Sequence, residues 1–176
     1  MADMRGALGS SDKSDWVTPW WVVRFFEGRY GKFSLDPCAT IRSAKARKWY
    51  GPNSPHGEDG LSLPWKGNVF VNPPYGSGIA PWVNKAAAES ELKRNRRVVM
   101  LLPVRTDTQW FIPCYAASAW IFFTGRIVFE REDGAPSISA PFPSVAVVFE
   151  GNSLLRNLEV VNYSSRELER NYKCRL

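Results

Sequence analysis

The chain has 176 residues, of which 44% are hydrophobic and 14% aromatic, enough for the core of one domain but short for two. Lysine and arginine outnumber aspartate and glutamate by 23 to 17, and the net charge of +6 fits either a polyanionic partner or an ordinary solvated surface. No stretch resembles a membrane span or a signal peptide. The three cysteines have unrelated spacings, which argues against a disulfide framework and structural zinc. We therefore expect a metal-free cytoplasmic protein.

Composition divides the chain into a small, polar, flexible lead-in at 1–15, one domain at 16–163 and a polar tail at 164–176. The domain opens with Thr18-Pro19 and an apolar run that stops at Gly31. Threonine as N-cap, proline as first helical residue and glycine as terminator predict a short helix.

Strands and helices then alternate along the chain. Strands are expected at 32–39, 67–71, 96–104, 145–151 and 157–163, with two more around Thr124-Gly125, and helices at 81–95 and at 106–118, where Pro113 interrupts the pattern. This alternation indicates an α/β fold, an open and mainly parallel twisted sheet with helices on both faces.

Three strands are expected to end in polar corners, DPCA at 36–39, NPPY at 72–75 and LPVR at 102–105. Ligands of open α/β sheets collect at the carboxyl ends of the strands, so these corners should converge on one crevice. The chain has no GxGxxG and no GxxxxGK[ST], which weakens a nicotinamide or nucleoside triphosphate interpretation.

The NPPY corner can activate an exocyclic amino group on a planar ring. The Asn72 side-chain oxygen and the Pro73 carbonyl can each accept one amino proton, which keeps the nitrogen lone pair out of conjugation. Pro73 and Pro74 stiffen the corner, and Tyr75 offers a face for stacking, worth about 1–3 kcal/mol per base. The alternative is a tight strand-to-helix turn without chemistry.

Two further residues, Asp36 and Thr18, suit the binding of an amino-acid group. Asp36 can accept hydrogen bonds from an ammonium, although Asp-Pro is also a common turn. Thr18 and the free amides of its helix can bind a carboxylate. An ammonium and a carboxylate together describe the methionine end of S-adenosylmethionine.

The ordered set WVTP, FSLDPCA, GEDGL with a following Trp, VFVNPPYG, LLPVRTDTQWF, GRIVF and APFPS resembles phage-type DNA N6-adenine methyltransferases, the Dam-like family. The resemblance runs from about Trp16 to Phe149. It implies a Rossmann-like class I methyltransferase fold and the transfer of a methyl group from S-adenosylmethionine to adenine N6 in DNA, leaving S-adenosylhomocysteine. It also implies a phage or prophage origin and a role related to restriction-modification.

The resemblance assigns roles to individual residues. Asn72, Pro73, Pro74 and Tyr75 would be catalytic; Trp16, Thr18, Pro19, Asp36, Pro37, Cys38, Ala39, Asp59, Gly60 and Leu61 would bind the cofactor; and Arg105, Asp107, Trp110 and Arg126 would contact DNA. One departure is that DPCATIRSAK lacks the glycine-rich turn common in related enzymes. For the cofactor ribose, Glu58 and Asp59 are candidates, with loop solvation as the alternative.

DNA is the expected partner, as a duplex from which the target adenine is flipped out. The patch Arg42, Lys45, Arg47 and Lys48 is interpreted either as a DNA contact or as a solvated helix, and Arg96-Arg97 lies at the wrong end of its strand for DNA. The protein would be a monomer or weak homodimer. Alternatives are methylation of cytosine N4 or of RNA adenine, and a catalytically idle DNA-binding relative.

Overall fold

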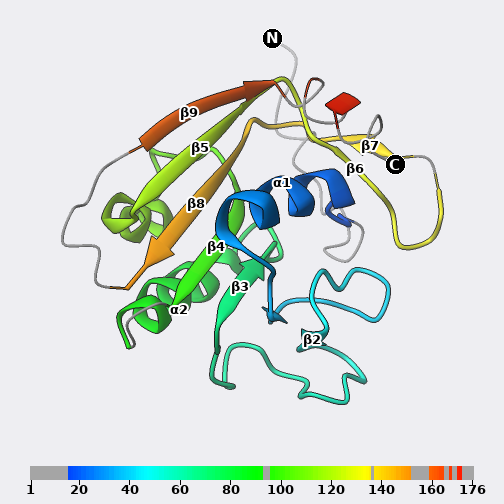
Figure 1. Ribbon diagram of the computed structural model, residues 1–176, viewed down its shortest axis with the longest axis vertical. Coiled ribbons are helices and arrows are strands. Elements are labelled where there is room, and N and C mark those ends of the chain that lie inside the picture. The colour runs from blue at the N-terminus through cyan, green and yellow to red at the C-terminus, as the bar shows by residue number, and fades with distance from the viewer. Residues whose placement is uncertain are drawn as a thin grey trace, which may run out of the picture.

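The computed structural model describes residues 16–92, 96–135, 137–151, 159–164, 167, 170 and 171. Within them the chain forms a seven-stranded sheet in the order β2-β1-β3-β4-β8-β5-β9 (Figure 1). Its strands are β1 Leu35–Asp36, β2 Lys48–Trp49, β3 Asn68–Val71, β4 Arg97–Pro103, β5 Ala119–Thr124, β8 Ser144–Glu150 and β9 Glu159–Ser164. A separate ribbon pairs β6 Val128–Phe129 with β7 Ile138–Ser139.

The large sheet is parallel except for β8, which runs antiparallel to both β4 and β5. The pairs β1–β2, β1–β3, β3–β4 and β5–β9 are all parallel. The expectation of an open and mainly parallel α/β sheet is therefore confirmed. Because β1, β3 and β4 point the same way, their carboxyl ends share one edge of the sheet. Of the three predicted corners, those after β1 and β3 line a common crevice, whereas residues 102–105 after β4 do not.

Helices cover both faces of the sheet. The side chains of β4 (Arg97–Pro103) point alternately to the two faces and so contact both layers of helices. Val98, Met100 and Leu102 belong to the core that includes α2 (Ile79–Glu91) and the 3₁₀ helix η2 (Gln109–Ala116). Val99 and Leu101 belong to the opposite core, against α1 (Trp20–Tyr30), which crosses in front of the sheet in Figure 1. A strand buried on both faces needs the continuous apolar sequence found here.

Several local predictions need correction. The N-cap of α1 is Pro19 rather than Thr18, so the helix starts one residue later than expected, while Gly31 ends it with a φ of 84°. The helix α2 begins at Ile79, ahead of Pro81. Thr124-Gly125 does separate two strands, but the second pairs with β7 because residues 127–130 turn away to meet Val17 and Ala140.

Residues 40–47 form turns rather than a helix, so the solvated-helix interpretation of the basic patch is wrong. The predicted strand near the C-terminus is present as β9. The expected lead-in at 1–15 lies outside the described residues, as does most of the tail. None of the described helices is long and apolar enough to cross a membrane.

Candidate active site

Two adjoining cavities lie where the corners after β1 and β3 meet. The larger has a volume of about 250 Å³ and is lined by Trp16, Pro37, Cys38, Ala39, Thr40, Ser43, Tyr50, Gly51, Pro52, Glu58, Asp59, Gly60, Asn72, Pro74, Trp82 and Glu132. The smaller, about 30 Å³, is lined by Trp16, Thr18, Asp36, Cys38, Ser43, Lys45, Phe70 and Asn72. Four residues, Trp16, Cys38, Ser43 and Asn72, line both cavities, so the two cavities adjoin.

The predicted cofactor residues divide between the cavities. Trp16, Pro37, Cys38, Ala39, Asp59 and Gly60 line the larger one, and Thr18 and Asp36 line the smaller one. Pro19 and Leu61 line neither, since Pro19 caps α1 and Leu61 follows the Asp59 turn. These residues come from positions between 16 and 60 of the sequence. The sheet topology brings them together, because the carboxyl ends of parallel strands lie at one edge of the sheet.

The NPPY corner meets the cavities through Asn72, which lines both, and Pro74, which lines the larger. The Asn72 amide nitrogen donates to the Trp16 carbonyl at 3.0 Å, and its oxygen accepts from the Tyr75 hydroxyl at 2.7 Å. Because the amide nitrogen bonds the Trp16 carbonyl and the amide oxygen bonds the Tyr75 hydroxyl, the orientation of the Asn72 amide is fixed. Within the described residues the Pro73 carbonyl accepts no hydrogen bond, but Pro73 is buried and lines neither cavity.

Tyr75 lines neither cavity and is half-buried in an aromatic wall. Its ring meets Phe142 edge to face at 5.2 Å, and Phe142 in turn lies 6.1 Å from the Trp16 ring. Burial raises the pKa of the Tyr75 hydroxyl well above its usual value, so the group stays a hydrogen-bond donor. The predicted stacking role of Tyr75 stays a prediction.

Asp36 organises the loop that follows β1. One carboxylate oxygen accepts from the Cys38 amide at 3.2 Å and the other from the Lys45 amide at 3.0 Å. Burial raises the pKa of Asp36 to about 6, opposed by these hydrogen bonds and by the nearby Lys45 charge. Burial, together with the Asp36 charge, also raises the pKa of the Cys38 thiol, which disfavours the thiolate.

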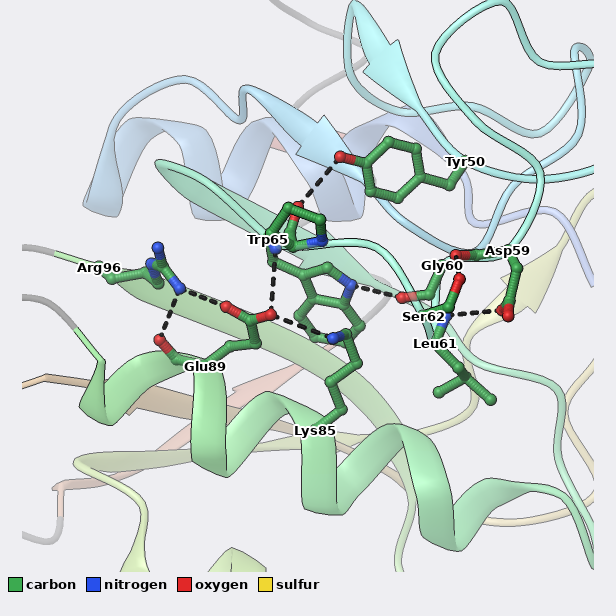
Figure 2. Close-up of polar contacts among 10 residues, drawn as sticks. Tyr50, Asp59, Gly60, Leu61, Ser62, Trp65, Lys85, Glu89 and Arg96 are labelled. Carbon is green, nitrogen blue, oxygen red and sulfur yellow. Dashed lines mark hydrogen bonds and ion pairs between the residues drawn. The ribbon is translucent and has the colours of Figure 1, made fainter.

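The segment 59–65 is fastened to α2, as Figure 2 shows. The Trp65 indole donates to the Gly60 carbonyl at 2.7 Å, and the Trp65 amide donates to Glu89, which also pairs with Arg96 and Lys85. A Cβ at Gly60 would lie 1.8 Å from the Pro37 carbonyl oxygen, so only glycine fits. This anchoring holds the predicted DGL segment against the corner after β1.

The larger cavity is lined by three carboxylates, Glu58, Asp59 and Glu132, and by no lysine, arginine or histidine of the described chain. Asp59 accepts from the Leu61 amide, which lowers its pKa. Glu132 was not among the predicted site residues. It reaches the cavity from the 130–135 loop, where Thr40 donates to its carboxylate at 2.6 Å and Arg42 to its carbonyl at 2.8 Å.

The predicted DNA contacts line neither cavity. Arg105, Asp107 and Arg126 are exposed and Trp110 is half-buried. Arg96 pairs with Glu89 and Arg97 with Glu150, and neither lines a cavity, in agreement with the prediction that this pair faces away from the crevice. Lys45 of the basic patch is only 4% exposed, so it cannot belong to a solvated surface.

Metal ligands were not expected, and the described residues contain no group of three His, Cys, Asp or Glu side chains that could hold an ion. The Cys114 thiol is buried in the core, and Cys174 lies outside the described residues.

Comparisons with known proteins identify the family of the chain. The family model for DNA N-6-adenine-methyltransferase (Dam) matches residues 6–172. A DNA N-6-adenine-methyltransferase of Haemophilus phage HP1 is 33% identical over 164 residues, covering 90% of this chain and 91% of that protein. One of Escherichia phage T1 is 31% identical over 121 residues, covering 68% of this chain but 48% of that protein.

Among solved structures, the methyltransferase subunit of a type I restriction-modification system from Streptococcus thermophilus superimposes with a TM-score of 0.51 at 12% identity. The match covers 93% of this chain and about half of that subunit, 53%, and supports a Rossmann-like methyltransferase fold. The fold, the ordered motifs and the match over nearly the full length lead to one conclusion: the chain belongs to the DNA N-6-adenine-methyltransferase (Dam) family.

Proposed function

We propose that the chain transfers a methyl group from S-adenosylmethionine to the N6 amino group of adenine in DNA. The observation that carries the proposal is the position of Asn72, which lines both cavities with its amide orientation fixed by Trp16 and Tyr75. A family-typical amino-binding corner therefore lies beside a space that suits a small ligand with a polar end.

The charge of the larger cavity supports this cofactor. Three carboxylates and no cationic side chain among its lining residues favour a positively charged ligand and disfavour phosphates. S-adenosylmethionine would supply an electrophilic methyl carbon on a sulfonium. Tyr50 and Trp82 offer aromatic surface for its adenosine part, and Glu58 and Asp59 are the carboxylates available to the ribose.

The roles of the chain's own residues follow from the contacts at the corner. The Asn72 oxygen, already accepting from Tyr75, has a second lone pair for one amino proton, and the Pro73 carbonyl accepts the other. The adenine nitrogen then forms a bond to the methyl carbon as the carbon–sulfur bond breaks and its electron pair stays on sulfur. The amino group loses one proton to water afterwards, so the corner needs no strong base.

The acceptor is proposed to be a flipped-out adenine of duplex DNA, because a stacked base cannot reach the corner. Arg105, Asp107, Trp110 and Arg126 are proposed to contact the DNA at the rim. We further propose that the protein is a monomer or weak homodimer. It would be encoded by a phage or prophage and work in the cytoplasm of the bacterial host. The phage proteins to which the chain is similar support the origin.

The proposal is tested with S-adenosylmethionine carrying a tritiated methyl group and with duplex DNA, single-stranded DNA, RNA and protein as acceptors. Nucleoside digestion is expected to yield labelled N6-methyldeoxyadenosine from duplex DNA. Labelled N4-methylcytosine or methylated RNA would replace the proposed substrate. Absence of transfer by a protein that binds the cofactor would support the idle relative and overturn the proposal.

A further inference from the structure

The turn at residues 40–43 forms part of the wall of the larger cavity, through Thr40 and Ser43. Residues 40–47 form turns rather than a helix, and the backbone hydrogen bond that closes this turn runs from the Ala44 amide to the Thr40 carbonyl at 3.1 Å. Within the described part of the chain, the hydrogen bonds that reach the turn from outside both end on Glu132, 92 positions further along than Thr40. The position of this wall therefore depends on a distant residue.

Glu132 fixes the turn mainly through the Thr40 hydroxyl. This hydroxyl has one proton, which it donates to the Glu132 carboxylate at 2.6 Å, and its oxygen accepts from the amides of Arg42 and Ser43, both at 3.2 Å. The Arg42 guanidinium also donates to the Glu132 main-chain carbonyl at 2.8 Å. Hydrogen bonds to an ionised acceptor are stronger than those between neutral groups. Thr40, Arg42 and Glu132 are called the clasp below.

The loop that carries Glu132 is itself held beside the catalytic corner. Glu130 and Val17 exchange two backbone hydrogen bonds, each of 3.0 Å, and the Phe129 ring meets the Trp16 ring edge to face at 5.3 Å. The carbonyl of Trp16 accepts from the Asn72 amide. The clasp therefore joins the loop after β1 to the part of the chain that orients Asn72.

We propose that Glu132 is a positioning residue for the cofactor, which acts by holding the Thr40 turn against the larger cavity. The cofactor then leaves quickly when the hydrogen bond between Glu132 and Thr40 is lost. The inference rests on the proposed function and adds a residue that the sequence motifs did not indicate. Glu132 acts through Thr40, so a side chain that still accepts this hydrogen bond is expected to replace it.

The test measures the dissociation rate of S-adenosylhomocysteine by stopped-flow tryptophan fluorescence, since Trp16 and Trp82 line the cavity. Glu132→Ala and Thr40→Val are each expected to raise this rate about tenfold, as loss of a charged hydrogen bond does. The double variant should be no faster than either single variant, because both changes remove the same bond. The single-turnover rate of methyl transfer at saturating cofactor should stay within about twofold of wild type.

Three further variants separate the hydrogen bond from other effects. Glu132→Gln keeps an acceptor oxygen and Thr40→Ser keeps the hydroxyl, so both should dissociate S-adenosylhomocysteine within about threefold of the wild-type rate. Asp133→Ala removes the neighbouring carboxylate, which is exposed and lines neither cavity, and should leave the rate unchanged.

Three results would overturn the inference. Wild-type dissociation rates in both Glu132→Ala and Thr40→Val would mean that the clasp does not hold the cofactor site. A fast Glu132→Ala with an unchanged Thr40→Val would mean that Glu132 touches the ligand directly. A Glu132→Gln as fast as Glu132→Ala would mean that the charge acts rather than the hydrogen bond. If Glu132→Ala does not fold, the comparison of Thr40→Val with Thr40→Ser decides alone. Failure of the wild-type protein to bind S-adenosylhomocysteine would instead remove the proposed function.

Discussion

The two halves of the proposed site are built differently. On the cofactor side, side chains such as Asp36, Asn72 and Trp65 are at least half-buried, and hydrogen bonds fix their orientation. On the DNA side, Arg105 and Arg126 are exposed. An enclosed small-ligand site needs precise complementarity, whereas contacts to a phosphate backbone depend mainly on charge and tolerate loose geometry. Changes on the cofactor side should therefore have larger and more specific effects.

The largest expected effect is on stability, from Glu89→Ala. This change removes the partner of buried Arg96 and the acceptor of the Trp65 amide, so it should cost about 3–5 kcal/mol in the free energy of unfolding. Urea denaturation measures it. The control is Asp133→Ala, which breaks an exposed pair with Arg131 and should leave the free energy of unfolding nearly unchanged. Similar values for both would show that the 59–65 segment does not depend on Glu89.

Asn72→Ala should produce the largest loss of activity. By analogy with the loss of a donor that stabilises a transition state, we expect a fall in methyl transfer of about 100- to 1000-fold. Cofactor affinity should stay within about threefold of wild type. Single-turnover kinetics at saturating cofactor separates the two. A matching loss of cofactor affinity and rate would assign the corner a purely structural role.

Cofactor binding should weaken at acidic pH because Asp36 has a pKa raised to about 6. The carboxylate is needed to bind an ammonium, so affinity for S-adenosylhomocysteine should fall by about tenfold per pH unit below pH 6. The groups facing Asp36 in the small cavity are Lys45, whose pKa burial lowers, and Cys38, whose pKa burial raises. Affinity for 5′-methylthioadenosine should stay flat, and Asp36→Asn should abolish the pH dependence. A pH-independent wild type would contradict this role.

Tyr75→Phe separates the hydroxyl from the ring. It removes the hydrogen bond that orients Asn72 and keeps the edge-to-face contact with Phe142, so kcat should fall by about two- to tenfold while cofactor affinity is unchanged. In an Asn72→Ala background the same change should have almost no further effect, because the amide it orients is gone. Additive losses would show that the hydroxyl acts independently of Asn72.

The smallest effect is expected on the DNA side, from Arg105→Ala. Loss of one phosphate contact should weaken DNA binding a few-fold at low salt and less at high salt, and reduce the salt slope by about one. Fluorescence anisotropy with a labelled duplex measures this change. Unchanged cofactor affinity is the control, and an unchanged salt dependence would remove Arg105 from the interface.

The convergence of the corners after β1 and β3 could be predicted because local sequence patterns determine it. The Asp36 and Asn72 corners follow apolar strands, and parallel strands bring such ends together. Lys45 was misplaced because its sequence context is basic and polar, while its burial depends on Trp20 and Asp36 from other elements. Glu132 was missed for the same reason, since only the fold brings its loop to Thr40.

The fold, like the site, could be predicted only where local sequence patterns determine it. Continuous apolar runs identified β4 and β8 as buried strands, because a strand that is covered on both faces needs apolar side chains at every position. The pairing of β6 with β7 could not be predicted, since register between short strands depends on tertiary contacts. The one-residue error at the start of α1 arose because Thr18 fits an N-cap by residue type but lies in the small cavity instead.

The most direct test of the account is a crystal structure of the protein with S-adenosylhomocysteine. The account predicts the adenosine part in the larger cavity, the sulfur of the ligand near Asn72, and the amino-acid end at the smaller cavity beside Asp36 and Thr18. A ligand bound elsewhere, or bound with its amino-acid end outside the smaller cavity, would contradict it.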